Sequence, residues 1–214
     1  GRSTHQYHWK NESYRDFEHW LSHFRSRRRK EVRRERLAPE RLEAEVSALR
    51  GTELLDRHWQ AIEESYRSTV AKKGAYPYLT PDFFELMRTR LSHLVLALIA
   101  EHGGQTVATS LCFQQGQHLF GRYWGCQRAF RSLHFELCYH RPIELCIDNG
   151  WTRFEAGAQG PHKIRRGLLP AETYSVHWVA HRGLHAAVER AIGMERRHHE
   201  QQVQYLSERG PFHR

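Results

Sequence analysis

The spacing of apolar residues changes from a helical to an extended pattern near the middle of the chain. Over residues 16–24 and 42–66, apolar side chains recur at every third or fourth position, which predicts amphipathic helices. Three strand-like runs follow at residues 93–101, 106–114 and 118–125, and short glycine turns separate them. Turns of this kind join neighbouring antiparallel strands, so these runs predict a three-stranded meander.

After the meander the pattern predicts a helix, two strands and a long final helix. The first helix is expected over residues 134–149, with a kink at Pro142 because proline lacks a backbone donor. Strands are expected at residues 153–155 and 173–180, and the final helix at 183–207. A strand that follows a helical crossover can pair in parallel with the meander, so the order predicts a mixed α/β fold with one sheet flanked by helices.

Two expectations concern histidines near the end of the chain. By the alternation of a strand, at least one of His177 and Trp178 should point into the core. His198 and His199 are adjacent rather than one helical turn apart, and they are expected on the solvated surface of the final helix.

Positive charge is concentrated in one segment. The chain carries a net charge of +9, and residues 25–36 contain eight basic and two acidic residues. One interpretation is a face that binds the phosphates of RNA or of a polyphosphate donor. The other is a solvated helix in which Glu31 and Glu35 form ion pairs with neighbouring arginines. The candidate phosphate-binding residues are Arg28, Arg29, Lys30, Arg33 and Arg34.

Cysteine and histidine usage predicts neither a disulfide framework nor a metal site. The four cysteines form no Cys-x-x-Cys pair and lie in apolar surroundings, so buried free thiols in a reducing cytosol are expected. The seventeen histidines are scattered along the chain, and no metal site is expected. Since no run of eighteen apolar residues and no export signal is visible, the chain is expected to be cytoplasmic, without a membrane span.

The segment 154–170 contains the greatest density of chemically useful groups. It holds three glycines, a carboxylate, an amide, an imidazole and three cations. It is expected to form a loop between two strands, where binding and catalytic groups are often placed. In the alternative interpretation, Glu155 only pairs with a nearby cation and the glycines only form turns.

Several segments together resemble the bacterial FemAB-like family of GNAT-type acyltransferases, in the branch labelled peptidoglycan biosynthesis or recognition. The resemblance covers roughly residues 9–188. It is carried by the segments Ser-Arg-Arg-Arg-Lys-Glu-Val-Arg-Arg-Glu-Arg at 26–36, Trp-Gly-Cys at 124–126, Leu-His-Phe-Glu-Leu-Cys-Tyr at 133–139, Phe-Glu-Ala-Gly-Ala-Gln-Gly at 154–160, and His162-Lys163. Pro161 departs from the family, which is expected to have an acidic residue there.

The resemblance implies a GNAT-like central sheet, mixed and largely antiparallel, flanked by helices. Family members are nearly twice as long and contain two GNAT-like halves, and this chain resembles the C-terminal half. That interpretation agrees with a first residue, Gly1, that is not methionine. Residues 1–52 are then expected to be an N-terminal helical segment with the basic run, and residues 53–214 the acyltransferase domain. The N-terminal half is an expected partner.

The resemblance also implies transfer of an acyl or aminoacyl group to an amine, in the cell envelope or on its precursors. Fem transferases take amino acids from charged tRNA, whereas ordinary GNAT enzymes use acyl-CoA. A CoA site needs a glycine-rich turn that places backbone donors on the pyrophosphate. Residues 125–131 contain one glycine and bulky side chains, so CoA bound in the usual manner is less expected here than in a typical GNAT protein. The donor stays open between aminoacyl-tRNA and acyl-CoA. No tightly bound cofactor is expected.

Aminolysis of an activated ester needs a base for the amine and donors for the oxyanion. The candidate bases are Glu155, at a strand end, and Glu136 or His134, near a helix start. The candidate substrate-binding residues are Gln159, His162, Lys163, Gly157, Gly160, Tyr139 and Trp124. Trp124 has an alternative place in the core. The alternative function is a non-catalytic half that holds RNA or an anionic precursor through the arginine run.

Overall fold

The chain forms one seven-stranded sheet in a computed structural model that describes residues 1–127 and 130–213. The strand order is β2-β3-β4-β5-β6-β1-β7, and every pair is antiparallel except β5 and β6. The strands are β1 (Arg2–Lys10), β2 (Glu45–Arg50), β3 (Val95–His102), β4 (Gln105–Gln115), β5 (His118–Cys126), β6 (Arg153–Glu155) and β7 (Leu169–Ser175). The mixed, largely antiparallel and GNAT-like sheet predicted from the sequence is therefore confirmed.

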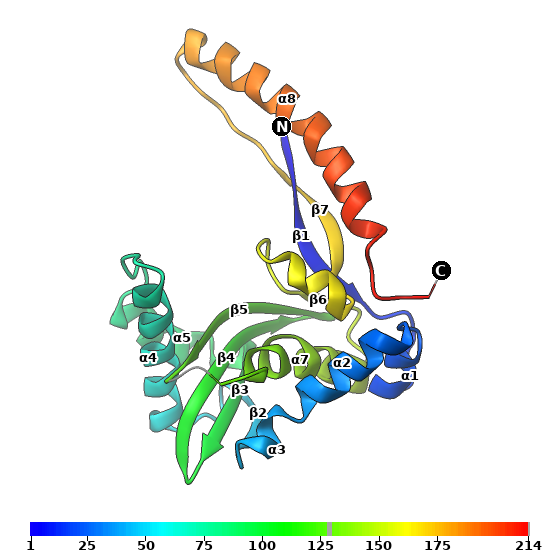
Figure 1. The fold of residues 1–214 in the computed structure, drawn as a ribbon. Helices are drawn as coiled ribbons and strands as arrows, with labels where there is room; N and C mark the ends of the chain where they lie inside the picture. The colour runs from blue at the N-terminus through cyan, green and yellow to red at the C-terminus, as the bar shows by residue number, and fades with distance from the viewer. Residues whose placement is uncertain (128–129, 214) are drawn as a thin grey trace.

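Helices cover the two faces of this sheet unequally (Figure 1). On one face, α4 and α5 pack on β3 and β4, and on the other α1, α2, α3 and the helices after β5 pack on the whole width of the sheet. The helices are α1 (Phe17–Ser22), α2 (Ser26–Arg36), α3 (Ala38–Arg41), α4 (Asp56–Lys72), α5 (Pro81–Arg90), α6 (Leu133–Phe135), α7 (Arg141–Asp148) and α8 (Arg182–Ser207). Shorter turns are the 3-10 helices η1 (Ser92–Leu94) and η3 (Pro161–Arg166) and the π-helical η2 (Glu136–His140).

The predicted meander is confirmed as β3, β4 and β5, and β6 is confirmed over residues 153–155. The helix predicted over 134–149 is present, as α6, η2 and α7 in succession. Pro142 lies in the first turn of α7, directly after the π-helical turn. Because residues 133–148 are helical in succession, the missing donor of Pro142 falls inside the helix, next to the π-helical turn where the regular bonding pattern already changes.

The prediction of helix throughout residues 42–66 is wrong, because residues 45–50 form β2 at the edge of the sheet. Leu42, Val46 and Leu49 have a helical spacing, but Val46 pairs with Ala100 of the buried strand β3. Six consecutive residues of β2 pair with β3. Pairing with a buried neighbour therefore outweighs a local spacing that fits either structure.

The first strand, β1, was not predicted, and it lies between β6 and β7. Its buried positions are Tyr7, His8 and Trp9. Together β1 and β2 mean that residues 1–52, expected to be helical, supply two strands to the sheet. Both strands pair with strands from residues 53–214.

The strand predicted at 173–180 lies earlier, as β7 (Leu169–Ser175). His177 and Trp178 follow its last residue and both are exposed, so the prediction that one of them enters the core is wrong. Residues beyond the end of a strand are outside the sheet, so the alternation of inward and outward side chains no longer applies to them.

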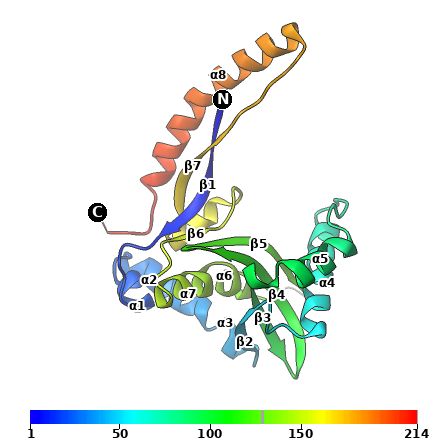
Figure 2. The same cartoon turned by 180° about the vertical axis from the view of Figure 1, so that it is seen from behind.

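The strands β1 and β7 extend past the rest of the sheet and form an arm with α8 (Figures 1 and 2). Along this arm Arg2 pairs with Glu195, and the ring of His5 stacks on that of His199 at 5.1 Å. His199 is buried, so the prediction of a solvated surface position is wrong for this residue. The reason is that α8 turns back along β1.

All four cysteines are free, as predicted, and Cys112 and Cys146 are buried. Cys126 and Cys138 are partly buried. Burial raises the pKa of the Cys112 thiol to about 12. Such a thiol is protonated at neutral pH and unreactive.

Substitution of Gly125 by alanine should lower the free energy of unfolding by about 1–3 kcal/mol. A Cβ at this buried position of β5 would lie 2.2 Å from the carbonyl oxygen of Ser65 in α4, so the helix would have to move away from the sheet. The matched control is Gly193→Ala in α8, where a Cβ meets nothing within 4 Å. The control should stabilise by about 0.5–1 kcal/mol. Urea denaturation of both variants measures the difference, and equal effects would contradict this account of the helix-sheet contact.

Candidate active site

A small cavity forms where the two parallel strands separate. The strands β5 and β6 pair only from His118 with Arg153 to Phe120 with Glu155, and β5 then continues to Cys126 without a partner on that side. The cavity has a volume of about 110 Å³. Its lining residues are Ser110, Gly121, Arg122, Tyr123, Trp124, His134, Cys138, Tyr139, Phe154 and Ala156.

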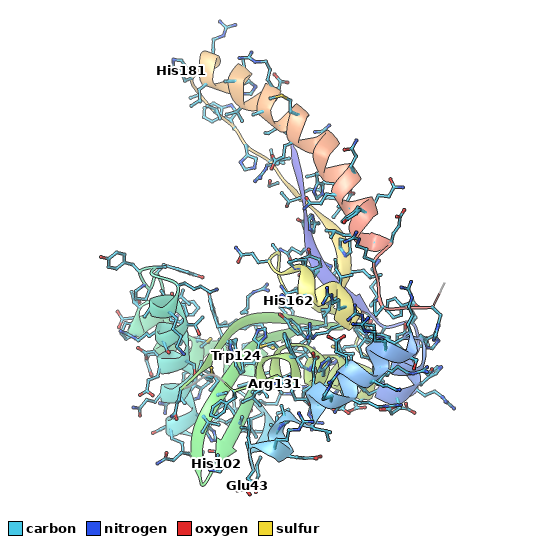
Figure 3. All side chains as sticks on the ribbon, viewed as in Figure 1. Glu43, His102, Trp124, Arg131, His162 and His181 are labelled. Atoms are coloured by element: carbon cyan, nitrogen blue, oxygen red, sulfur yellow. The ribbon has the colours of Figure 1, made fainter. Side chains whose placement is uncertain are left out.

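Three predicted site residues meet beside this cavity. The hydroxyl of Tyr139 lies 3.0 Å from Nε2 of His162, and the ring of His134 lies 5.3 Å from that of Tyr139 and 6.2 Å from that of His162. Trp124 packs on His134 with a centroid distance of 5.2 Å. Figure 3 shows Trp124 on the sheet and His162 on η3, both distant from His102 at the meander end and His181 at the arm tip.

The local conformation of the chain after β5 brings His134 and Tyr139 to the same side. His134 lies in the short helix α6, and Tyr139 lies one turn later in the π-helix η2. The wider turn adds a residue to the helical repeat, and π-helical turns recur at functional sites. The two side chains therefore line one cavity although their spacing is five residues.

The imidazoles of this cluster are neutral at physiological pH. Burial lowers the pKa of His134 to about 4. Burial, together with the cations Arg166 and Lys163, also lowers the pKa of His162. Burial raises the pKa of Tyr139, so its hydroxyl keeps its proton. Each neutral imidazole of the cluster has one donor and one acceptor nitrogen, and the Tyr139 hydroxyl can donate or accept.

Lys163 is a buried cation next to the cluster. Its Nζ donates to the carbonyl oxygens of Ala156 at 2.5 Å and Gly157 at 3.2 Å. It also lies 5.5 Å from the ring centre of Tyr7. Burial lowers its pKa to about 8. The ammonium therefore holds the end of β6 and the loop after it against η3.

The glycines of the loop give room and shape to the same region. A Cβ on Gly160 would lie 2.4 Å from Cε1 and 2.9 Å from Nδ1 of His162, so only glycine leaves this side of the imidazole open. Gly157 has a φ of +79°, which favours glycine. Gln159 is exposed, and its amide has no protein partner among the described residues.

Glu155, a predicted base, lies on the other face of the sheet from this cavity. Neighbouring residues of a strand point to opposite faces, and it is Phe154 that lines the cavity. The carboxylate of Glu155 pairs with Arg153 at 2.9 Å and lies 3.9 Å from His8. The structure therefore does not bring Glu155 together with His134 or His162.

Glu136, the other predicted carboxylate base, points toward α2. Its Oε1 lies 3.7 Å from Arg36, and its Oε2 is buried without a partner among the described residues. Burial raises the pKa of Glu136 to about 7. Glu136 is thus a partly protonated acid at the contact between η2 and α2, and it does not line the cavity.

The arginine run forms α2, and its cations differ in their contacts. Arg28 pairs with Glu31, Arg33 pairs with Glu18, and Arg29 donates to the carbonyl of Ser22. Arg27, Lys30 and Arg34 are exposed and form no ion pair within the described part of the chain. These three side chains of α2 are left available to an anionic partner.

The turn expected to reject CoA follows β5, and part of it, Arg128 and Ala129, lies outside the described residues. Ser132, directly before α6, has a φ of +67° and makes no side-chain cap. The three residues of α6 lead straight into η2.

Sequence reasoning missed three contributors to the site. Tyr7 comes from the unpredicted strand β1, and Arg166 and Glu35 form a buried ion pair. Glu35 was interpreted as a partner of arginines on its own helix. Its position three residues after the buried Val32 was the available signal, because residues three apart share a helix face.

Acid should destabilise the fold through His134. The pKa of its imidazole is lowered to about 4 in the folded chain by burial, from an ordinary value near 6.5. The unfolded state therefore binds more protons between these values, and stability present above pH 6.5 is lost toward pH 4, by about 3 kcal/mol.

The pH dependence of urea denaturation for wild type and His134→Phe measures this contribution. The variant should show a shallower loss of stability between pH 6.5 and 4. His93→Phe, at an exposed position of η1, is the control. Parallel curves for wild type and His134→Phe would contradict a neutral, buried imidazole.

Comparison with known families and structures shows what the chain is similar to. The profile of the FemAB-like family, described as peptidoglycan biosynthesis/recognition, matches residues 1–214. A search of curated protein sequences finds no match.

Among solved structures, FemX is similar with a TM-score of 0.53 and 12% identity, over 85% of this chain and 56% of that one. L-PGS from Bacillus licheniformis is similar with a TM-score of 0.51 and 10% identity, over 82% of this chain and 50% of that one. The C-terminal domain of a putative lysylphosphatidylglycerol synthetase from Agrobacterium fabrum is similar with a TM-score of 0.50 and 11% identity, over 73% of this chain and 47% of that one. The chain spans about half the length of these structures, and the similarity shows a shared fold.

Two further observations concern membranes and metals. Among the described residues, no helix has both the length and the apolar character to cross a bilayer. In the same part of the chain, no three side chains of the kinds that bind metals lie close enough to hold an ion.

Proposed function

Because the chain belongs to the FemAB-like family, we propose that it is an acyltransferase half that moves an aminoacyl group from charged tRNA to an amine of a cell-envelope precursor. The observation that carries the proposal is the cluster of His134, Tyr139 and His162 beside the cavity between β5 and β6. The family description names peptidoglycan, and one structural neighbour is named for lysyl attachment to a lipid.

The chemistry needs one proton acceptor and one path for the proton. The acceptor amine attacks the ester carbonyl, an amide bond forms, and the ester bond to the ribose oxygen breaks. His162 takes the proton from the amine, and the same proton then leaves with the ribose hydroxyl. A neutral imidazole beside a residue that lines the cavity is suited to both steps.

Each neighbour of His162 has a separate contribution. Tyr139 holds Nε2, and a bond donated by Nε2–H leaves Nδ1 free on the side that Gly160 keeps open. Lys163 places positive charge next to the loop, where it favours a developing oxyanion. His134 and Trp124 form the wall behind the reacting group.

The donor in this proposal is tRNA rather than CoA. The chain after β5 has one glycine over residues 125–131, whereas a pyrophosphate cradle needs a glycine-rich turn before a helix. Lys30 and Arg34 on α2 are exposed and supply cations for a phosphate backbone.

The test is a transfer assay with the full-length protein, offered a mixture of radiolabelled aminoacyl-tRNAs or acetyl-CoA together with a peptidoglycan-precursor peptide. We expect label in the precursor from aminoacyl-tRNA and none from acetyl-CoA. Transfer from acetyl-CoA alone would overturn the choice of donor. Binding of tRNA without any transfer would favour the alternative, a non-catalytic half that holds RNA through α2.

A further inference from the structure

One buried carboxylate, that of Glu35, contacts both segments that build the histidine cluster. Its Oε2 accepts from Nε of Arg166 at 2.9 Å and lies 2.8 Å from Nε2 of His140. Its Oε1 accepts from Nη2 of Arg166. Glu35, Arg166 and His140 are all at least nine-tenths buried. Both oxygens of the carboxylate are therefore engaged as acceptors.

The two partners of Glu35 lie next to the two site residues that bond to each other. His140 follows Tyr139 in η2, and Arg166 lies one turn after His162 in η3. Arg166 also donates from Nη1 to the carbonyl oxygen of His162 at 2.9 Å. The 3.0 Å contact between Tyr139 and His162 thus spans two segments that Glu35 joins.

Phe135 completes the arrangement from the side of the cavity. The guanidinium of Arg166 lies 3.4 Å from the centre of the Phe135 ring, and the same ring lies 6.0 Å from that of His162. The guanidinium is therefore fixed by a bidentate ion pair, a backbone acceptor and an aromatic face. Little freedom remains for the turn that carries His162.

We propose that Glu35 is a positioning residue of the transfer site, which sets the Tyr139–His162 contact by holding His140 with one oxygen and Arg166 with both. The expected effect of Glu35 on catalysis rests on the proposed function. The expected effect of Glu35 on the Tyr139–His162 contact does not depend on that function. Glu35 belongs to the arginine run, so that run contributes to the site through its acid as well as through its cations.

The charges at this pair must be removed together, because a single substitution leaves a buried charge without its partner. The variant Glu35→Gln/Arg166→Met replaces both with side chains of similar size. The matched control is Glu18→Gln/Arg33→Met. It removes an exposed ion pair whose charged atoms are 2.6 Å apart and whose arginine, like Glu35, lies on α2. Both double variants change the same residue types.

The first measurement is the tautomer of His162, by ¹⁵N NMR of histidine-labelled full-length protein, with the signal assigned by His162→Asn. One tautomer should dominate in wild type and in the control, since a fixed contact between Nε2 and Tyr139 makes the two ring nitrogens unequal. In Glu35→Gln/Arg166→Met, both tautomers should appear while the protein stays folded. A single unchanged tautomer in the folded double variant would overturn the proposal.

The second measurement is the transfer rate, expected to fall roughly 10- to 100-fold in kcat with KM nearly unchanged. If the double variant does not fold, Glu35→Asp takes its place, since the shorter acid cannot reach both partners and should also mix the tautomers. An unmixed tautomer in Glu35→Asp would overturn the proposal equally. Absence of transfer in wild type would refute the proposed function, while the NMR result would still decide the positioning role.

Discussion

Substitution of His162 by asparagine should lower the rate of aminoacyl transfer by about 100-fold or more, with little change in the free energy of unfolding. His162 is the one imidazole of the cluster that is exposed to solvent, so its loss leaves no cavity in the core. A positioned base contributes roughly 10²- to 10⁴-fold to such a step. Asparagine keeps a polar group near Tyr139 and removes the titrating nitrogen.

The measurement compares kcat for wild type and His162→Asn under saturating aminoacyl-tRNA, with urea denaturation to establish that the variant is folded. His177→Asn is the control, because His177 is exposed beyond β7 and contacts only Ser175 among the bonds found. Activity of His162→Asn within threefold of wild type would contradict its role as the base. Glu155→Gln would then test the carboxylate on the opposite face.

Substitution of Arg166 alone by methionine should lower the free energy of unfolding by about 3–5 kcal/mol. The substitution leaves the carboxylate of Glu35 buried, with His140 as its remaining partner. Burial by itself raises the pKa of Glu35, but the bonds from His140 and Arg166 outweigh burial and the folded pKa is lowered. Loss of Arg166 removes most of the favourable interactions that offset the burial of the Glu35 carboxylate.

The loss of stability in Arg166→Met should depend on pH, and the titration of Glu35 sets the direction of that dependence. Since the folded pKa of Glu35 is lowered, its stabilising contribution is present above the unfolded pKa and is lost as pH falls through the folded value. The difference between wild type and Arg166→Met should therefore be large at pH 7 and shrink in acid, where the unpaired carboxyl takes up a proton.

The control for this comparison is Arg33→Met on the exposed side of α2. Arg33 pairs with Glu18 at 2.6 Å, and both side chains are more than half exposed. Exposed pairs of this kind contribute about 0–1 kcal/mol. Urea denaturation at pH 7 should separate the two substitutions clearly, and equal losses would contradict the buried geometry of the Glu35–Arg166 pair.

The helix α2 has two sides that its composition does not distinguish. One side presents exposed cations, including Lys30 and Arg34. The other side presents Val32 and Glu35 to the core. Ion pairs within α2 and with α1 are present for Arg28 and Arg33. Binding of an anionic partner by the remaining exposed cations stays a prediction.

Local pattern was sufficient for the elements whose neighbours in space are also neighbours in sequence. The meander of β3, β4 and β5 was predictable because short glycine turns force adjacent runs to pair. The strand β6, the crossover helix and α8 were also predicted from the sequence. Within the polar segment 154–170, His162 and Lys163 contact two other candidates, Tyr139 and Gly157, and their roles in a site stay predictions.

Only the tertiary structure decided which of the candidates lie together. Glu155 and Phe154 are adjacent in sequence, yet the alternation of β6 sends one to each face of the sheet, and the face that the cavity occupies depends on how β5 and β6 pair. The roles of β1, β2 and Glu35 likewise depend on partners more than forty residues away. Sequence by itself therefore determined the types of group and their local elements, because these follow from short-range spacing. The long-range pairing of strands and buried charges determined the site, because residues distant in the chain contribute its geometry.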